Sequence, residues 1–186
     1  ILDGKKEVIN TSKQALDLGV SMIHQELHPE PHLSVMENIW LGRFPIKGIV
    51  VDYKKMYNDT RDLLERLNLH LDPKALVKTL SVSQIQSIEI AKAVSFNAKV
   101  IIMDEPTSSL TEEEVQKLFV IIRQLKEEGV AVLMVSSDIE EVVELADRAI
   151  TIFQGRINGE FSHDEISQDV LTSASFGIGH ERVVAK

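Results

Sequence analysis

Residues 99–111, which read KVIIMDEPTSSLT, constrain the fold of this chain more than any other stretch. The apolar run 100–103 predicts a central strand of a parallel sheet, covered by helices on both faces. Asp104 and Glu105 follow at the carboxyl end of that strand, where open α/β sheets place their ligands. Because neighbours on an extended chain point to opposite sides, one acid is suited to magnesium and the other to an attacking water. Acids that only cap the next helix are the equally compatible alternative.

Composition narrows the class of protein. The chain has 186 residues and a net charge of -9, and 44% of its residues are hydrophobic, which is enough for one sizeable core. No apolar run reaches the roughly 20 residues that a membrane-spanning helix needs. The absence of cysteine excludes disulfides and thiolate metal sites. Residues 104–144 hold eleven acids against three bases, which indicates a solvated face. Since no basic stripe is present, nucleic-acid binding is not expected.

Helices and strands alternate in the predicted order of elements, which indicates an α/β fold with a mainly parallel sheet. Residues 42–51 predict a loop, residues 130–135 a second buried strand, and the segment after Gly177 a loose tail. Two capping boxes are predicted, Thr111 with Glu114 and Ser137 with Glu140. The predicted strands are 20–24, 100–103, 130–135 and the hairpin 149–161; the predicted helices are 12–18, 34–41, 52–69, 83–96, 111–127, 137–145 and 163–173.

Three motifs together resemble those of the ATP-binding cassette (ABC) ATPases: Gln25 after a strand, LSVSQ at 80–84 and MDEPTSSLT at 103–111. The likeness is greatest to bacterial sugar importers with two cassettes in one polypeptide, of the galactose/methyl-galactoside type, through VSMIHQEL and SVMENIWLGRFP. It covers the chain after about residue 5. It implies a single partial P-loop NTPase domain over 1–186. A helical signature subdomain would occupy about 33–96, and the Walker B half with a C-terminal hairpin and helix would occupy 97–186.

The resemblance assigns the signature role to LSVSQ, where the family usually carries LSGGQ. Serine hydroxyls and backbone N–H groups at a helix N-terminus favour an anion such as a γ-phosphate. Two glycines of the usual motif are replaced here, which narrows the freedom of the backbone. An ordinary serine-capped helix is the alternative. The nucleotide-binding candidates in this motif are Leu80, Ser81, Val82, Ser83 and Gln84.

Other roles are implied in the same way. Gln25 stands where the family's Q-loop glutamine contacts magnesium and the attacking water, although a lone glutamine that ends a strand is weak evidence. Asp104 matches the magnesium-ordering aspartate of Walker B, and Glu105 matches the catalytic glutamate. Residues 108–111 match the D-loop, in which Ser109 is a further nucleotide-binding candidate. In the family, the signature and the D-loop serve the nucleotide held by the opposite cassette.

Two departures from the family pattern matter. The sequence contains no GxxxxGK[ST], the phosphate-binding loop that in the family precedes the Q-loop and would lie before Ile1. Little or no ATPase activity is therefore expected of this chain alone. Ser137 stands where active cassettes place a histidine. Residues 135–161 resemble the end of a second cassette, which suggests a chain that joins parts of two cassettes within about 112–130.

The resemblance implies a fragment of an ATPase subunit that couples ATP hydrolysis to monosaccharide uptake, with ATP and Mg²⁺ as cofactors. The implied partners are membrane permease subunits and either a cassette with Walker A or a second copy, at the inner face of the cell membrane. A non-catalytic interaction remnant or degraded gene product without a nucleotide role is the alternative. The sequence specifies neither the sugar nor the oligomeric state.

Two smaller candidates have plain explanations. His24, His28 and His32 have the spacing of metal ligands on a helix, but the two intervening prolines forbid a regular helix there. Trp40 lies in the segment where the family meets its membrane partner, and packing under the helical subdomain explains it equally well.

Overall fold

The computed structural model describes residues 1–178, which form two compact units, Ile1–Val135 and a second that begins at Ser136. The predicted loose tail lies outside the described residues from 179 onward. The first unit contains α1 (Ser12–Asp17), β1 (Val20–Ile23), α2 (Val35–Ile39), β2 (Ile46–Lys47), β3 (Val50–Val51), α3 (Tyr53–Arg66), the 3-10 helix η1 (Val77–Thr79), α4 (Val82–Val94), β4 (Val100–Asp104), α5 (Glu112–Glu127) and β5 (Ala131–Val135). The second contains α6 (Ile139–Leu145), β6 (Arg148–Phe153), β7 (Arg156–Ser162), the 3-10 helix η2 (His163–Glu165) and α7 (Gln168–Ser175).

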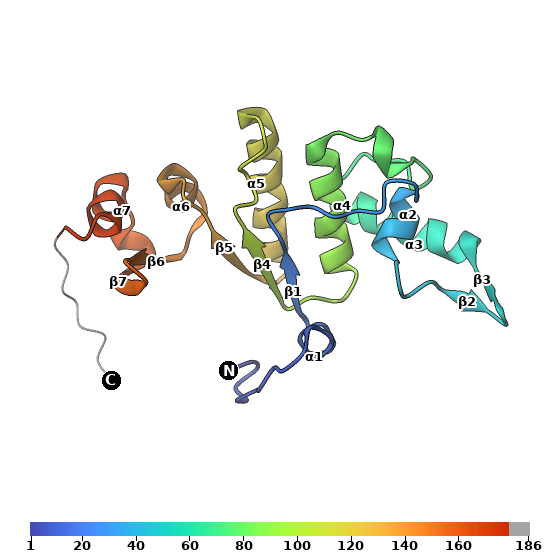
Figure 1. Cartoon of the computed structure of the whole chain (residues 1–186), viewed down its shortest axis with the longest axis horizontal. Helices are drawn as coiled ribbons and strands as arrows, with labels where there is room; N and C mark the ends of the chain where they lie inside the picture. Colours follow the sequence, from blue (N-terminus) through green and yellow to red (C-terminus); the bar gives the residue numbers. More distant parts are fainter. Residues whose placement is uncertain (179–186) are drawn as a thin grey trace. The chain divides into compact units, whose positions relative to one another are not determined.

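The first unit is built on a parallel sheet with the strand order β1-β4-β5, which confirms the predicted α/β class (Figure 1). The helix α5 makes the crossover from β4 to β5, as parallel neighbours require. Ile101 and Met103 on β4 are completely buried, whereas Ile102 is half-buried. The prediction of a buried strand at 130–135 is wrong: Leu133 and Val135 are 54% and 48% exposed. In the described chain β5 pairs only with β4, which leaves its other edge unpaired, and its exposed residues alternate along the strand, so one of its faces is uncovered.

The helices of the first unit begin near the predicted residues. Where a start differs from the prediction, a different residue caps the helix. Ser34 caps α2, as expected from the predicted start of helix 34–41, and it does so in a capping box with Glu37 that was not predicted. Thr11, rather than Ser12, caps α1. α4 begins at Val82 and is capped by Ser81, whereas the sequence placed its start at Ser83. The predicted loop 42–51 contains the short hairpin β2–β3, whose turn is allowed by the positive φ of Gly48 (68°).

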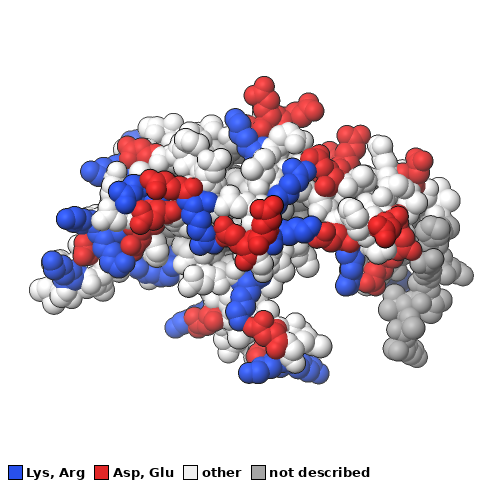
Figure 2. Space-filling view, turned by 180° about the vertical axis from the view of Figure 1, so that it is seen from behind, with Lys and Arg blue, Asp and Glu red and all other residues white. Residues whose placement is uncertain are grey.

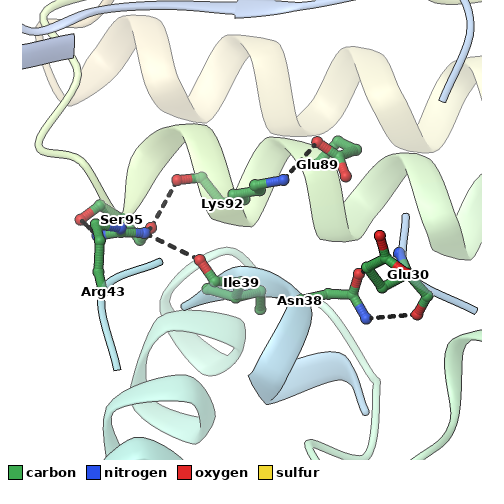
Figure 3. A network of polar contacts seen from close by, with 7 residues as sticks. All are labelled: Glu30, Asn38, Ile39, Arg43, Glu89, Lys92 and Ser95. Atoms are coloured by element: carbon green, nitrogen blue, oxygen red, sulfur yellow. Dashed lines mark hydrogen bonds and ion pairs between the residues drawn. The ribbon is translucent and has the colours of Figure 1, made fainter. Parts of the chain in front are cut away.

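The helices α2, α3 and α4 pack together into a layer that presents the signature segment. Arg43 closes one end of this layer (Figure 3). Its guanidinium donates to the carbonyl oxygen of Ile39 (2.9 Å) and to the carbonyl oxygen (3.2 Å) and hydroxyl (2.6 Å) of Ser95. The ring centroid of Phe96 lies 3.6 Å from the guanidinium carbon. Burial lowers the pKa of Arg43, while its charge is favoured by the C-terminal ends of two helices.

Packing, rather than a free aromatic surface, accounts for Trp40. Its indole N–H donates to the hydroxyl of Thr60 on α3 at 2.9 Å, and Thr60 is completely buried. The far end of α3 is held as well, because Arg66 forms an ion pair with Glu128 next to the C-terminus of α5. The C-terminal end of α3 is therefore attached to α5, whereas the bond from Trp40 holds α2 and α3 together within the helical layer.

The second unit is an antiparallel hairpin, β6–β7, covered by α7. Its turn at Gln154 and Gly155 has positive φ angles of 48° and 74°, as in a type I′ turn. Ala149, Phe161 and Leu171 are buried in its core. The predicted final helix 163–173 is divided in the structure into η2 and α7. The buried core of the second unit therefore lies between the hairpin and α7.

The surface carries both signs of charge. On the face drawn in Figure 2, lysine and arginine side chains are interspersed with aspartate and glutamate. Within residues 1–178, no helix combines the length and the apolar character needed to cross a bilayer.

Candidate functional site

The carboxyl edge of the parallel sheet gathers the predicted acidic and amide side chains. Ile23 pairs with Met103 in the register of β1 and β4, so both strands end at the same edge (Figure 1). Gln25 follows the end of β1 and is exposed, and Asp104 is the half-buried last residue of β4. The topology therefore brings Gln25 and Asp104 to one edge of the sheet, which is where α/β folds bind ligands.

Glu105 adopts a backbone conformation that the sequence did not reveal. Its φ is 45°, in the left-handed region that non-glycine residues rarely occupy. Its backbone N–H donates to the carbonyl oxygen of Val135 at 2.9 Å, so the β4–β5 ladder continues to this residue. Such a conformation costs on the order of 1–3 kcal/mol and is often found at functional sites. It turns the chain sharply between the two acids, so that they do not simply alternate along a strand.

The signature residues form the N-terminus of α4. The hydroxyl of Ser81 accepts the backbone N–H of Gln84, and the Gln84 side chain accepts the N–H of Ser81 at 3.0 Å, which completes a capping box. The hydroxyl oxygens of Ser81 and Ser83 are 3.0 Å apart. Val82 is 50% exposed, and Leu80 is half-buried directly before the cap. The exposed helix end has the polarity that favours an anion.

The signature helix is bonded to the segment that follows Walker B. The Ser83 hydroxyl donates to a carboxylate oxygen of Glu114 on α5. One turn along α4, the side-chain amide of Gln86 donates to the carbonyl oxygen of Pro106, and Gln86 is only 6% exposed. The bond from Ser83, with others from Thr111, lowers the pKa of the Glu114 carboxyl.

Sequence reasoning identified Glu114 only as a capping residue and did not single out Gln86. The capping box at Thr111 is confirmed. Its second bond to Ser83 could not be predicted, because it joins residues 31 positions apart. The one available signal for Gln86 was a polar residue on an otherwise apolar side of α4.

The D-loop candidates lie between β4 and α5. Ser108 and Ser109 are both exposed, while Thr107 before them is 8% exposed. The N–H of Leu110 donates to the Thr107 carbonyl at 2.9 Å, which makes this segment a turn. Ser109 is therefore available to a neighbouring molecule.

Ser137 belongs to the second unit, and the predicted capping box there is wrong. The N-cap of α6 is Asp138, whose carboxylate accepts the N–H of Glu140 at 2.9 Å. The hydroxyl of Ser136 donates to the buried carboxylate of Glu141 at 2.7 Å. An aspartate one residue later competes successfully for the cap because its side chain reaches the same N–H groups.

Residues 1–178 contain no group of three or more histidine, cysteine, aspartate or glutamate side chains that could hold a metal ion. The three spaced histidines therefore form no such group. Mg²⁺ needs fewer protein ligands, since it usually takes one or two carboxylates and completes its shell with water and phosphate oxygens. Asp104, with the amide oxygen of Gln25 at the same edge, fits that donor set.

Comparison with known proteins defines the class. The family model of the ABC transporter matches residues 1–108, more than half of the chain. The chain therefore belongs to the ABC transporter family.

Curated relatives narrow the likeness further. The galactose/methyl galactoside import ATP-binding protein MglA of Clostridium tetani is 52% identical over 181 residues, which cover 95% of this chain and 36% of that protein. MglA of Salmonella typhimurium is 51% identical over 156 residues, which cover 84% of this chain and 31% of that protein. The chain spans about a third of the length of these relatives. The suggested joint at 112–130 stays a prediction.

Solved structures show the same fold. The ATP-binding cassette MJ1267 in its ADP conformation superposes with a TM-score of 0.71 at 25% identity, covering 86% of this chain and 66% of that chain. The dimeric, post-hydrolysis cassette MJ0796 bound to ADP and Pi gives 0.68 at 20% identity, covering 83% and 68%. The predicted ABC ATPase fold is confirmed.

Proposed function

We propose that this chain is part of the ATP-binding subunit of a galactose/methyl-galactoside importer, in which ATP hydrolysis drives monosaccharide uptake. One observation carries the proposal: α4, which begins with the signature sequence, is bonded to Pro106 directly after the Walker B acids and to Glu114 on the first turn of α5. The identity to the MglA proteins supports the sugar class. Membrane permease subunits are the proposed partners, with the chain bound peripherally at the cytoplasmic face.

The chemistry of the proposed site follows from residues at the carboxyl edge of the sheet. Asp104 and Gln25 would hold Mg²⁺ through oxygen atoms, and Glu105 would orient or deprotonate the attacking water. ATP with Mg²⁺ supplies the phosphoryl group that passes to water. The left-handed conformation of Glu105 gives the two adjacent acids different backbone geometries, which supports different roles for them.

We further propose that the 186 residues are not catalytic by themselves. They contain no GxxxxGK[ST], so the N–H cradle and the lysine that bind the β- and γ-phosphates must come from residues outside these 186 or from another cassette. The signature residues and Ser109 would then act on the nucleotide held by that cassette. The exposure of Ser81, Val82 and Ser109 supports this role.

The test adds the chain to a purified sugar-importer cassette that contains Walker A. The expected result is tighter binding of a non-hydrolysable ATP analogue and faster hydrolysis in the mixture, with no turnover by the chain alone. Ser81→Ala should lower the stimulation, because it removes the hydroxyl at the helix N-terminus. Glu113→Gln, an exposed change on the first turn of α5, is the matched control.

Two results would contradict the proposal. Turnover by the chain alone that is abolished by Glu105→Gln would show that it is catalytic without Walker A. An absence of any effect on the second cassette, with the chain folded, would favour the alternative of an interaction remnant or degraded gene product without a nucleotide role.

A further inference from the structure

We infer that Glu114 is a positioning residue that ties the signature end of α4 to the D-loop segment, so that the two move as one body. The tie itself is a property of the first unit, whereas its consequence for hydrolysis rests on the proposed function. Both segments are exposed and would face the same neighbouring cassette. A fixed spacing between them would therefore set how both approach one nucleotide.

The two carboxylate oxygens of Glu114 make different bonds. One accepts the hydroxyl of Ser83 on α4. The other accepts the N–H and the hydroxyl of Thr111, at 3.0 and 3.1 Å, where the D-loop enters α5. The Ser83 hydroxyl oxygen also lies 3.0 Å from that of Ser81, the N-cap of α4. A continuous chain of side-chain contacts thus runs from the signature cap to the end of the D-loop.

A second, independent bond joins α4 to the residues that lead from Walker B into the D-loop. Gln86 lies three residues after Ser83, on the same side of the helix, and its amide reaches the carbonyl oxygen of Pro106. Gln86 and Pro106 are buried, so this bond is shielded from water and competes less with solvent. Two attachments one turn apart restrain both the position and the orientation of the N-terminal end of α4.

The serine at position 83 is essential to the tie at the surface. A glycine there would have no hydroxyl, and an alanine would fill the space without a donor. Glu114 is charged at neutral pH, since its pKa is lowered by these bonds, and bonds to a charged acceptor are stronger than neutral ones. Ser83→Ala therefore removes this bond while it leaves the Thr111 cap in place.

The first experiment uses the 186-residue chain alone and measures amide hydrogen exchange by segment. Ser83→Ala should raise exchange about fivefold in both 81–85 and 107–114, the amount expected for one hydrogen bond. Ser87→Ala is the matched control, because its hydroxyl donates to the Ser83 carbonyl within α4 and leaves α5 untouched. An increase confined to 81–85 would overturn the inference.

Glu114→Gln gives a second variant with the same purpose. The glutamine amide has a single oxygen and cannot serve both Ser83 and Thr111 in the way that the carboxylate does. Its exchange pattern should match that of Ser83→Ala in 81–85, and the double variant should add no further increase there. Additive increases would show that the two residues act separately, and would overturn the inference.

The second experiment measures the hydrolysis that the chain stimulates in a cassette with Walker A. Ser83→Ala and Glu114→Gln should each lower the maximal stimulated rate severalfold, without changing the concentration of chain that gives half-maximal stimulation. Ser87→Ala and Glu113→Gln should change neither quantity. Equal maximal rates for all variants would assign Glu114 a purely structural role and overturn its positioning role. An absence of stimulation by the wild-type chain would instead contradict the proposed function. The exchange experiment alone would then show whether Glu114 links the signature end of α4 to the D-loop segment.

Discussion

The N-termini of α4 and α6 are both preceded by serine-containing segments, yet they are held in different ways. At α4, the capping box of Ser81 is supplemented by two bonds to another element, from Ser83 and from Gln86. At α6, the cap comes from Asp138, and the hydroxyl of Ser136 bonds to a carboxylate of the same helix. Both ends therefore combine a local cap with a bond to another element, but the bond from Gln86 at α4 is buried, whereas the bond at α6, from the side-chain amide of Gln168 on α7 to Glu140, is exposed.

This difference bears on what each segment can do. A helix end that is bonded to a distant segment transmits a displacement of that segment, because the bonds must break or move together. A helix end whose bonds are all local is little affected by displacements elsewhere in the molecule. The signature end thus has a buried bond to a distant segment in addition to its cap, while the start of α6 has a local cap and an exposed bond to α7.

The largest expected effect comes from the buried tie. Gln86→Leu should lower the free energy of unfolding of the first unit by about 2 kcal/mol, because the Pro106 carbonyl loses its donor in a buried position. Urea denaturation followed by circular dichroism measures the change. A loss as small as that of the half-buried Ser87→Ala would show that the bond contributes little and would weaken the contrast with α6.

The next effect concerns the local cap of α6. Asp138→Ala should lower the free energy of unfolding by about 1 kcal/mol, and Asp138→Asn should have little effect, because asparagine caps nearly as well. Thermal and urea unfolding of the two variants provide the measurement. If alanine and asparagine behave alike, the cap lies elsewhere, as the sequence had suggested for Ser137.

The smallest effect is the pH dependence of the surface tie. The pKa of Glu114 is lower in the folded chain than in the unfolded one, so its bonds add stability above the unfolded value of about 4.3. That contribution is lost as the pH falls through the folded pKa. The difference in urea midpoint between the wild type and Ser83→Ala should shrink between pH 5 and pH 3 (about one unit on either side of the unfolded value).

A midpoint difference that stays constant over this range would show that the bond does not depend on the charge of Glu114. The nearby Lys117, which also lowers this pKa, lies on the same helix. Lys117→Met is therefore the control that separates its contribution from that of Ser83.

Much of the architecture could be read from residue patterns. The apolar run before Asp104 predicted a strand in a parallel sheet, and Thr111 with Glu114 predicted the start of α5. These features depend on neighbours within one or two turns. The exposure of Leu133 could not be read in this way, because an apolar strand has the same composition whether or not an element covers it.

The same distinction between local and tertiary features applies to the candidate site. The sequence by itself determined which residues stand at strand ends and helix starts: Gln25, Asp104, and the serines of the signature. Only the tertiary structure decided that Glu105 turns into the left-handed region, and that Ser83 and Gln86 are bonded to Glu114 on α5 and to Pro106 after Walker B. The physical reason is distance along the chain: caps and strands are set by local bonds, whereas a bond between residues 20 or 31 positions apart forms only when the packed sheet and helices bring them together.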